Sequence, residues 1–365
     1  MRILLIGEYS GLFNCLKDGL LSIGHDVFLA SDGDGYRDYP SDFRWDRSER
    51  FGKLNAIAKY INILVHLSFF KGYDVVMFVS TRVFIANKTS FLNKILYKYI
   101  IKNNKLSYIC DSGLDYIGMR YWYEHSNEKY YHYVLGYCDH EDHSSILLNR
   151  TYETNEYDIR NSVNGLIPIW YEYAQPYRQF PNLRKAIRIP INIDKFKYKP
   201  NKIQNGKIVF FHGLSRPCKG GLYIQQAFDR MREKYADIAE FICAGGLPFD
   251  EYMKITSRAN VILDDVNSYS FSMNALFAMS RGIIYMGGAE PEGNAELDYV
   301  DCPVINLTRN VEQICKAIEH IIANKDRIEE MGLACRKFVE KNHSHVDIAK
   351  KYVEYWNQDL QEIKS

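Results

Sequence analysis

Short apolar runs recur along this chain, each ending in a glycine or polar turn and each followed by apolar residues at helical spacing. In the first half they predict strands at residues 3–6, 27–30, 74–79, 107–110, 166–170 and 187–189. In the second half they predict strands at residues 208–211, 241–244, 261–263, 283–286 and 304–305. Alternating strands and helices are typical of parallel sheets covered by helices. The pattern therefore predicts an α/β protein with two Rossmann-like βαβ series.

The two series are joined by a polar, proline-bearing run between residues 184 and 200. A chain of 365 residues also exceeds one ordinary hydrophobic core. We therefore predict a first domain at residues 1–186, a second at 187–343, and a C-terminal amphipathic helix at 344–365 that packs on the first domain. The mixed-charge segment 37–50 is predicted to be an exposed loop.

Glycines mark the turn after the first predicted strand. Gly7 and Gly11 lie there, and we expect them to border a ligand site. The turn lacks the G-x-G-x-x-G fingerprint of dinucleotide-binding folds, so a dinucleotide-dependent oxidoreductase is a weak alternative.

The loop after the strand at 208–211 has a more specific composition. It reads HGLSRPCKGG and carries two cations, Arg216 and Lys219, before a helix that starts near Leu222. The first N–H groups of a helix have no partner within it and form an anion site together with the helix dipole. Arg216 and Lys219 would add charge-assisted hydrogen bonds. This stretch predicts a phosphate site, with an ordinary solvated loop as the alternative.

Composition limits the remaining function classes. With 46 basic and 45 acidic side chains the formal charge is +1, which gives no general argument for nucleic acid. The eight cysteines form no C-x-x-C pair, so we expect reduced thiols and no metal site. No signal peptide and no apolar run of roughly 18 residues is present, which predicts a cytoplasmic protein.

The segment 82–105 carries six cations and no acid. Lys94, Lys98 and Lys102 fall on one helical face, as in a basic amphipathic helix on an anionic membrane. An ordinary outer helix with a solvated lysine face is an equal alternative. A membrane contact here would place the protein at the inner face of the plasma membrane.

Three motifs in the second half resemble those of GT-B glycosyltransferases, specifically the family 4 type (glycosyl transferases group 1). The segment IRIPINIDKFKYKP (187–200) is similar to the family's interdomain I-P-N-G-V-D and F-x-P pattern. The loop HGLSRPCKGG is similar to G-R-x-S-x-x-K-G, and residues 268–296 are similar to the following E-G-F-G-L and E-A-M-A-x-G segment. The resemblance covers residues 187–345 and extends to the first half only by its βα rhythm and first turn.

The resemblance implies a GT-B fold, with two Rossmann-like domains facing across a cleft, an acceptor in the first and a nucleotide-diphosphate sugar in the second. Arg216 and Lys219 would then neutralise the diphosphate in place of a metal, and no other cofactor is expected. The donor would also contact residues in or near the matched loops. They are Gly213, Tyr269, Ser272, Met273, Asn274 and Glu290.

Two further residues are candidates to polarise an acceptor hydroxyl. Asp111 follows the strand at 107–110, and His132 lies in the tyrosine-rich region 121–137. A structural role is the alternative for each of them. The aromatic residues of 121–137 would line a sugar cleft or pack as a helix surface.

The chain departs from the family pattern at three positions. The family's arginine directly follows the loop glycine, whereas here Leu214 follows Gly213 and Arg216 lies two residues later. The two glutamates of the family, eight residues apart, align with Tyr269 and Phe277. The resemblance implies a hexosyltransferase that retains the anomeric configuration. We expect it to act on a glycan or polyprenyl-linked acceptor in bacterial surface polysaccharide (O-antigen or capsule) synthesis. The alternative is a catalytically impaired sugar- or nucleotide-binding subunit derived from a transferase.

Overall fold

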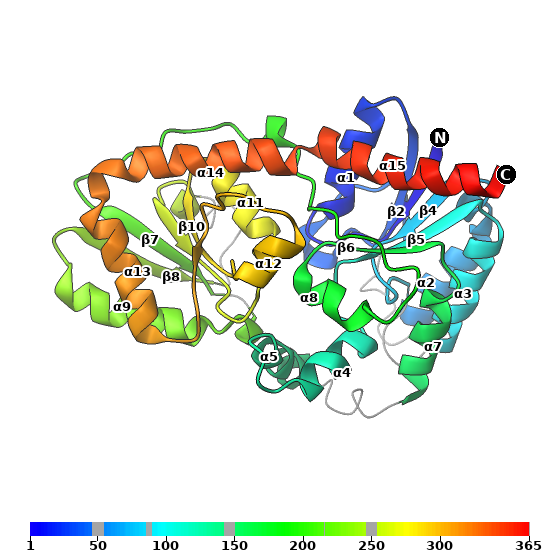
Figure 1. The fold of residues 1–365 in the computed structure, drawn as a ribbon, viewed down its shortest axis with the longest axis horizontal. Helices are drawn as coiled ribbons and strands as arrows, with labels where there is room; N and C mark the ends of the chain where they lie inside the picture. The colour runs from blue at the N-terminus through cyan, green and yellow to red at the C-terminus, as the bar shows by residue number, and fades with distance from the viewer. Residues whose placement is uncertain (46–54, 85–89, 142–149, 215, 246–253, 365) are drawn as a thin grey trace. The chain divides into compact units, whose positions relative to one another are not determined.

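A computed structural model describes the chain except for residues 46–54, 85–89, 142–149, 215, 246–253 and 365 (Figure 1). The chain divides into two compact units, each of which contains one sheet. Unit 1 comprises Met1–Tyr121, Ser145–Asn192 and His343–Ser365, and unit 2 comprises Trp122–Ser144 and Ile193–Asn342. Residues 122–144, which lie within the predicted first domain, thus belong to unit 2.

Unit 1 contains a six-stranded parallel sheet in the order β3-β2-β1-β4-β5-β6. The strands are β1 (Arg2–Ile6), β2 (Asp26–Ser31), β3 (Phe43–Arg44), β4 (Val75–Phe78), β5 (Leu106–Asp111) and β6 (Gly165–Pro168). Every residue of β4, β5 and β6 is buried, as expected for a parallel sheet covered on both faces. The main helices are α1 (Leu12–Ser22), α2 (Asn55–Val65), α3 (Ser90–Lys102), α4 (Tyr116–Glu124), α7 (Arg150–Arg160), α8 (Tyr171–Ala174) and α15 (His345–Lys364).

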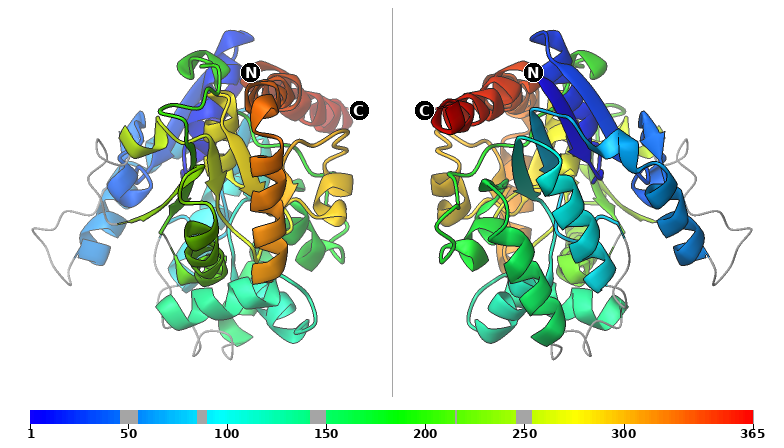
Figure 2. Two further views of the ribbon diagram at one scale, coloured as in Figure 1. Left: turned by 90° about the vertical axis from the view of Figure 1, so that its left-hand side faces the viewer. Right: turned by 90° about the vertical axis from the view of Figure 1, so that its right-hand side faces the viewer.

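Unit 2 contains a five-stranded parallel sheet in the order β11-β10-β9-β7-β8. The strands are β7 (Ile208–Gly213), β8 (Ala239–Ala244), β9 (Val261–Leu263), β10 (Ile284–Gly287) and β11 (Ile305–Asn306). The helices are α5 (Tyr131–Glu141), α9 (Gly221–Lys234), α11 (Met273–Ser280), α12 (Pro291–Glu296), α13 (Val311–Ala323) and α14 (Ile328–His343). Helices α9 and α13 lie side by side and bury the apolar face of the sheet (Figure 2).

The C-terminal helix α15 packs on α1 of unit 1, which confirms its predicted place (Figure 1). A side chain at Gly19 in α1 would bring its Cβ to 2.1 Å from the carbonyl oxygen of His345, so the two backbones are in direct contact. Trp356 of α15 is fully buried, and Asp359 accepts a hydrogen bond of 2.6 Å from the hydroxyl of Tyr108 in β5. These contacts tie the end of the chain to the first sheet.

Two predictions of local structure were wrong. The segment 37–50 is not wholly an exposed loop, because Phe43 and Arg44 pair with β2 as the edge strand β3 and Trp45 is fully buried. No strand forms at residues 187–189, which carry no regular secondary structure, and Ile191 forms an isolated bridge with Ser344. Pro190 offers no N–H to a strand ladder, which accounts for the second error. The sequence also predicts a short helix at residues 248–258, and most of this range lies outside the described residues.

The segment Trp122–Ser144, called the arm below, lies in the first half of the sequence but belongs to unit 2. Its helix α5 lies against the short 3-10 helix η7 (Pro217–Lys219). At the contact, a Cβ on Gly136 would lie 2.7 Å from Cα of Cys218. Only glycine lets the arm approach the backbone of the 212–221 loop so closely.

Candidate functional site

The strand order of unit 2 reverses between β7 and β9. In open α/β sheets the chain leaves such neighbouring strands in opposite directions, and ligands bind in the crevice at their carboxyl ends. The two loops at this point are residues 213–221, after β7, and residues 264–272, after β9. Both contain residues that the sequence analysis assigned to the donor site.

The loop after β7 turns into α9 at two glycines. Gly220 has a φ of +71°, and a Cβ there would lie 2.6 Å from Val266. Gly221, the first residue of α9, lies over the ring of His212, with 2.6 Å between its hypothetical Cβ and Nε2. The His212 Nδ1 lies 3.0 Å from the carbonyl oxygen of Leu263, so Nδ1 carries the proton. Burial lowers the pKa of His212 and keeps its ring neutral.

Lys219 forms the central ion pair of this edge. Its Nζ lies 3.0 and 2.9 Å from the two carboxylate oxygens of Asp264, which directly follows β9. Burial acts to lower the pKa of Lys219, but Asp264 and Asp265 outweigh it and raise the pKa. For Asp264, burial acts to raise the pKa, and Lys219 holds it below its usual value. Both groups are therefore charged.

Two more donors reach the same carboxylate. Asn274 donates from Nδ2 to Asp264 at 3.3 Å, and the hydroxyl of Tyr285 donates at 3.1 Å. The four side chains come from η7, the end of β9, α11 and β10. Asp264 thus fixes Lys219 at the switch point and connects it to the start of α11.

Asp265 shapes the next turn. Its Oδ1 accepts from the backbone N–H groups of Asn267 and Ser268, and its Oδ2 accepts from the hydroxyl of Ser268 at 2.7 Å. Burial nevertheless raises the pKa of Asp265 to about 7. This turn directs the chain into Tyr269 and then into α11.

The remaining predicted donor residues of these loops lie at the same edge. Gly213 ends β7, and Arg216 is exposed immediately before η7. Ser272 is the N-cap residue of α11, and Met273 is its first helical residue. Within the described residues no side chain caps the start of α9 or of α11. The first N–H groups of both helices are therefore available to an anion.

Three other predicted site residues either contact the arm or belong to it. The hydroxyl of Tyr269 donates to the carboxylate of Glu128, and Glu290 forms an ion pair of 2.7 Å with Lys129. His132 lies on α5, where burial and then Arg309 lower the pKa of its imidazole. Because the arm belongs to unit 2, the structure places His132 in the same unit as the predicted donor residues of the 213–221 and 264–272 loops, and not in unit 1 with Asp111.

Phe277 occupies the position where the resembled family has its second glutamate. Its ring packs against Phe196, with centroids 5.1 Å apart. Here α11 presents an apolar side chain to the interdomain segment, so this position contributes packing and no polar contact to a nucleoside.

The corresponding edge of unit 1 contains Gly7 and Gly11, with φ of +91° and +86°. Between them, Glu8 is 1% exposed and accepts hydrogen bonds from the N–H groups of Phe13 and Asn14 at the start of α1. Burial raises the pKa of Glu8 to about 7. The anion position at this helix is filled by the protein's own carboxyl group.

Asp111 lies in a buried polar cluster of unit 1. Its Oδ1 accepts from Arg160 at 2.6 Å, and Arg160 also pairs with Asp115. The guanidinium carbon of Arg160 lies 3.7 Å from the centroid of the Tyr177 ring. Burial raises the pKa of Asp111 to about 7, with Arg160 opposing it. Asp111 is 1% exposed, so its observed contacts are those of a structural ion pair.

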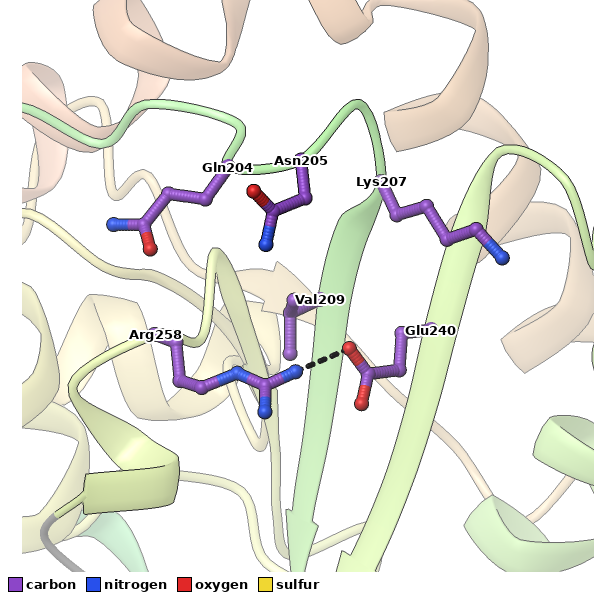
Figure 3. A pocket seen from close by; sticks show the side chains of 6 residues that line it. All are labelled: Gln204, Asn205, Lys207, Val209, Glu240 and Arg258. Atoms are coloured by element: carbon purple, nitrogen blue, oxygen red, sulfur yellow. Dashed lines mark hydrogen bonds and ion pairs between the residues drawn. The ribbon is translucent and has the colours of Figure 1, made fainter.

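A cavity of about 180 Å³ lies at the opposite end of the unit 2 sheet (Figure 3). Its lining includes Lys207 and Val209 at the start of β7 and the ion pair between Arg258 and Glu240. This is the amino end of the strands, away from the loops that contain Lys219 and Asp264. The cavity therefore does not belong to the switch-point site.

Among the described residues, no group of three or more His, Cys, Asp or Glu side chains is arranged to hold a metal ion. Likewise, no described helix is both long and apolar enough to cross a membrane. All eight cysteines are free thiols.

The two sheets, their switch points and the returning C-terminal helix define the GT-B fold, which confirms the predicted fold class. Anabaena HepE, solved with UDP and glucose, matches with a TM-score of 0.62 at 12% identity over 98% of this chain and all of HepE. Sucrose-phosphate synthase from Thermosynechococcus elongatus matches with a TM-score of 0.64 at 13% identity over 99% of this chain and all of that chain.

The same fold is shared with UDP-GlcNAc 2-epimerase from Neisseria meningitidis, solved with UDP-GlcNAc. It matches with a TM-score of 0.53 at 13% identity over 97% of this chain and 99% of the epimerase. No family model matches the sequence, and no curated protein matches it either. At these identities the comparisons establish the fold and leave the reaction to be argued from the site.

Sequence reasoning missed the partners of the predicted residues. Asp264 and Asp265 follow a predicted strand, and acidic residues in that position were a usable signal. Glu8, which stands between the two glycines, was another. Nothing local in the sequence indicates that Glu128 and Lys129 of the arm reach Tyr269 and Glu290.

Proposed function

We propose that this protein transfers a sugar from a nucleotide-diphosphate donor to a hydroxyl of a glycan or lipid-linked acceptor. The observation that carries the proposal is the switch point of unit 2, where Lys219 and two uncapped helix starts share one sheet edge. These groups fit a diphosphate. HepE was solved with UDP and also with UDP-glucose, which makes UDP-sugars the first donors to test.

In the proposed reaction, the bond between the anomeric carbon and the diphosphate oxygen breaks, and the leaving diphosphate keeps the electron pair. The oxygen of the acceptor hydroxyl forms the new bond to the anomeric carbon, and its proton passes to the leaving diphosphate oxygen. Lys219, Arg216 and the N–H groups at Ser272 and Met273 would stabilise the charge that develops on the diphosphate. In this mechanism neither a metal nor a cofactor other than the donor is required.

The finer assignment rests on the motif resemblance described above. We infer a hexosyltransferase of the family 4 type that retains the anomeric configuration and acts in bacterial surface polysaccharide synthesis. The three motifs at 187–200, 212–221 and 268–296 support this class. Analysis of the product's anomeric configuration by NMR tests retention directly, and an inverted product would contradict it.

We further propose a position at the inner face of the plasma membrane. Lys98 and Lys102 on α3 are exposed, whereas Lys94 is held by Asp158 of α7. On α2, Ile61 is 52% and Val65 is 69% exposed. Exposed apolar and basic helix surfaces are suited to an anionic bilayer. Residues 85–89 of the predicted basic segment lie outside the described residues.

Sedimentation with vesicles containing phosphatidylserine tests this surface. The variant Lys98→Glu/Lys102→Glu should bind several-fold less than wild type, and neutral vesicles should bind neither protein. Equal sedimentation of both proteins with anionic vesicles would contradict a contact through α3.

The second candidate function is a sugar- or nucleotide-binding subunit without transfer activity. Two observations favour it: Phe277 packs against Phe196 in place of a polar contact, and Asp264 already neutralises Lys219. A subunit of this kind would bind a nucleotide sugar and release it unchanged.

One assay separates these functions. The purified protein is incubated with UDP-glucose, UDP-GlcNAc and GDP-mannose, with and without a glycan mixture, and free nucleotide is measured. Acceptor-dependent release of the nucleotide supports transfer. Binding in a thermal-shift screen without release supports the subunit. An epimerised nucleotide sugar, or the absence of any nucleotide binding, would refute the proposed transfer.

A further inference from the structure

Two consecutive residues of the arm contact three loops at the carboxyl edge of the unit 2 sheet, those after β9, β10 and β11. Glu128 accepts from the hydroxyl of Tyr269, and Lys129 donates to Glu290 and to the carbonyl oxygen of Leu307, at 2.7 and 2.8 Å. Tyr269 and Glu290 are themselves joined, because the N–H of Glu290 donates to the carbonyl oxygen of Tyr269 at 2.9 Å. The four residues form a closed polar constellation within one unit.

The constellation is continuous with the ion pair of the switch point. Asp265, next to Asp264, holds the turn through Ser268, and Tyr269 follows it directly. The loop after β10 lies against the same turn, since a Cβ on Gly288 would lie 2.5 Å from the carbonyl oxygen of Ser268. A ligand whose diphosphate lies at Lys219 would therefore extend its next group toward this turn.

Apolar packing fixes the arm in this position. The ring of Trp122 stacks on that of Tyr269 with centroids 5.9 Å apart, and Trp122 is 1% exposed. Tyr130 contacts Trp122 at 5.3 Å and stacks on Tyr133 at 4.8 Å. The rings are buried, so they position the turn that contains Glu128 and are not open to a ligand themselves.

Glu128 is the exposed member of the constellation. Only its Oε2 is used, by Tyr269, and Oε1 has no hydrogen-bond partner among the described residues. A fixed carboxylate with a free oxygen is a strong acceptor for a hydroxyl donor. Lys129 and Glu290 differ from it, because their charges are paired and their side chains are 13% and 18% exposed.

We propose that Glu128 recognises a hydroxyl of the donor sugar and is a specificity-determining residue of the site. The proposal rests on the proposed function, since it needs a nucleotide sugar bound at the unit 2 switch point. Tyr269 and Lys129 are positioning residues: Tyr269 orients the carboxylate of Glu128, and Lys129 anchors the arm to Glu290. Glu128 thus places a carboxylate beside Tyr269, the position that aligns with the first glutamate of the resembled family.

The test measures the affinities of UDP and UDP-glucose separately by calorimetry. Glu128→Gln keeps the shape of the side chain and removes its charge. We expect UDP affinity to stay within about twofold and UDP-glucose affinity to fall about tenfold, the loss of one charge-assisted hydrogen bond. Tyr269→Phe should weaken UDP-glucose binding less, because it removes only the orienting hydroxyl. Glu233→Gln, on the exposed face of α9, is the matched control and should change neither affinity.

The outcomes separate the two claims. If wild-type protein binds neither UDP nor UDP-glucose but does bind another nucleotide and its sugar, the same measurement is made with that pair. If no nucleotide binds, the proposed function fails, and this inference fails with it. If UDP binds and Glu128→Gln leaves the difference between the UDP-glucose and UDP affinities unchanged, the inference alone is overturned. Equal weakening of UDP and UDP-glucose would assign Glu128 a structural role and also overturn it.

Discussion

The switch points of the two sheets use similar backbone and opposite side-chain chemistry. In unit 1 the loop after β1 contains Gly7 and Gly11 at positive φ, and in unit 2 the loop after β7 contains Gly220 at positive φ. In unit 1, Glu8 accepts from the first N–H groups of α1. In unit 2, α9 and α11 start without a side-chain cap in the described residues.

This difference shows that a glycine turn before a helix does not by itself make an anion site. Both turns let the backbone approach closely, as the 2.4 Å between a Cβ on Gly7 and Val79 also indicates. The two turns differ in whether a carboxyl group of the chain itself accepts hydrogen bonds from the first N–H groups of the following helix, as Glu8 does in unit 1. The unit 1 edge is closed to a phosphate there, and the unit 2 edge remains open beside Lys219.

The largest expected effect concerns the buried ion pairs of unit 1. Arg160→Ala removes the guanidinium that pairs with both Asp111 and Asp115, leaving two buried carboxylates without their cation. Breaking a buried pair in this way costs about 3–5 kcal/mol of the free energy of unfolding. Urea denaturation measures it.

The control is Arg327→Ala, which removes a solvent-exposed pair with Glu330. Exposed pairs contribute about 0–1 kcal/mol. A similar loss of stability for both variants would show that the unit 1 cluster is not a buried ion pair of the kind described.

The second prediction tests the open edge of unit 2. Removing both charges of the central pair, in Lys219→Ala/Asp264→Asn, avoids leaving one charge buried alone. We expect UDP affinity to fall about ten- to a hundredfold, equivalent to about 1.5–3 kcal/mol for a lost charge-assisted contact. Calorimetry gives the affinity, and the melting temperature reports the fold.

Lys207→Ala is the matched control, because Lys207 lies at the amino end of β7 beside the cavity in Figure 3. It should leave UDP affinity unchanged. If the control weakens UDP binding and the double variant does not, the ligand binds at the other end of the sheet.

The third prediction concerns pH and Glu8. Burial raises its pKa from 4.5 to about 7 in the folded state, so the native protein binds more protons than the unfolded chain between these values. The stability from the neutral carboxyl is full below pH 4.5 and is lost as pH rises through 7. Each unit of pKa difference corresponds to about 1.4 kcal/mol.

Glu8→Gln should flatten the fall of unfolding free energy between pH 5 and 8 relative to wild type. Denaturation at four pH values across this range measures the slope. Parallel profiles for the two proteins would contradict the titration of Glu8. The carboxyl groups of Asp111 and Asp265, whose pKa values are also about 7, contribute to the slope that remains.

The smallest expected effect tests how the unit 2 turn is held. Ser268→Ala removes a buried hydroxyl that donates to Asp265 at 2.7 Å, which should cost about 1 kcal/mol. Ser112→Ala is the counterpart in unit 1, where the hydroxyl donates to the carbonyl oxygen of Val79 at 2.7 Å. Only the Ser268 variant should also alter UDP affinity. If both variants or neither of them changed UDP affinity, the two sheet edges would not differ in function.

The sequence by itself determined the described strands other than the edge strand β3, the two parallel sheets and the helix that returns to unit 1. These follow from local periodicity, since buried strands and helix faces leave regular apolar patterns. It also located the loop that contains Lys219 and the helices that begin at Gly221 and Met273.

The tertiary structure alone decided which charges meet. Lys219 and Asp264 are 45 residues apart, and Tyr269 and Glu128 are 141 apart. A local sequence pattern indicates which face of a helix or strand is buried. It does not indicate which distant loop the fold brings next to a given side chain. The same limit explains why the arm was assigned to the first domain by its place in the chain, although its contacts lie in unit 2.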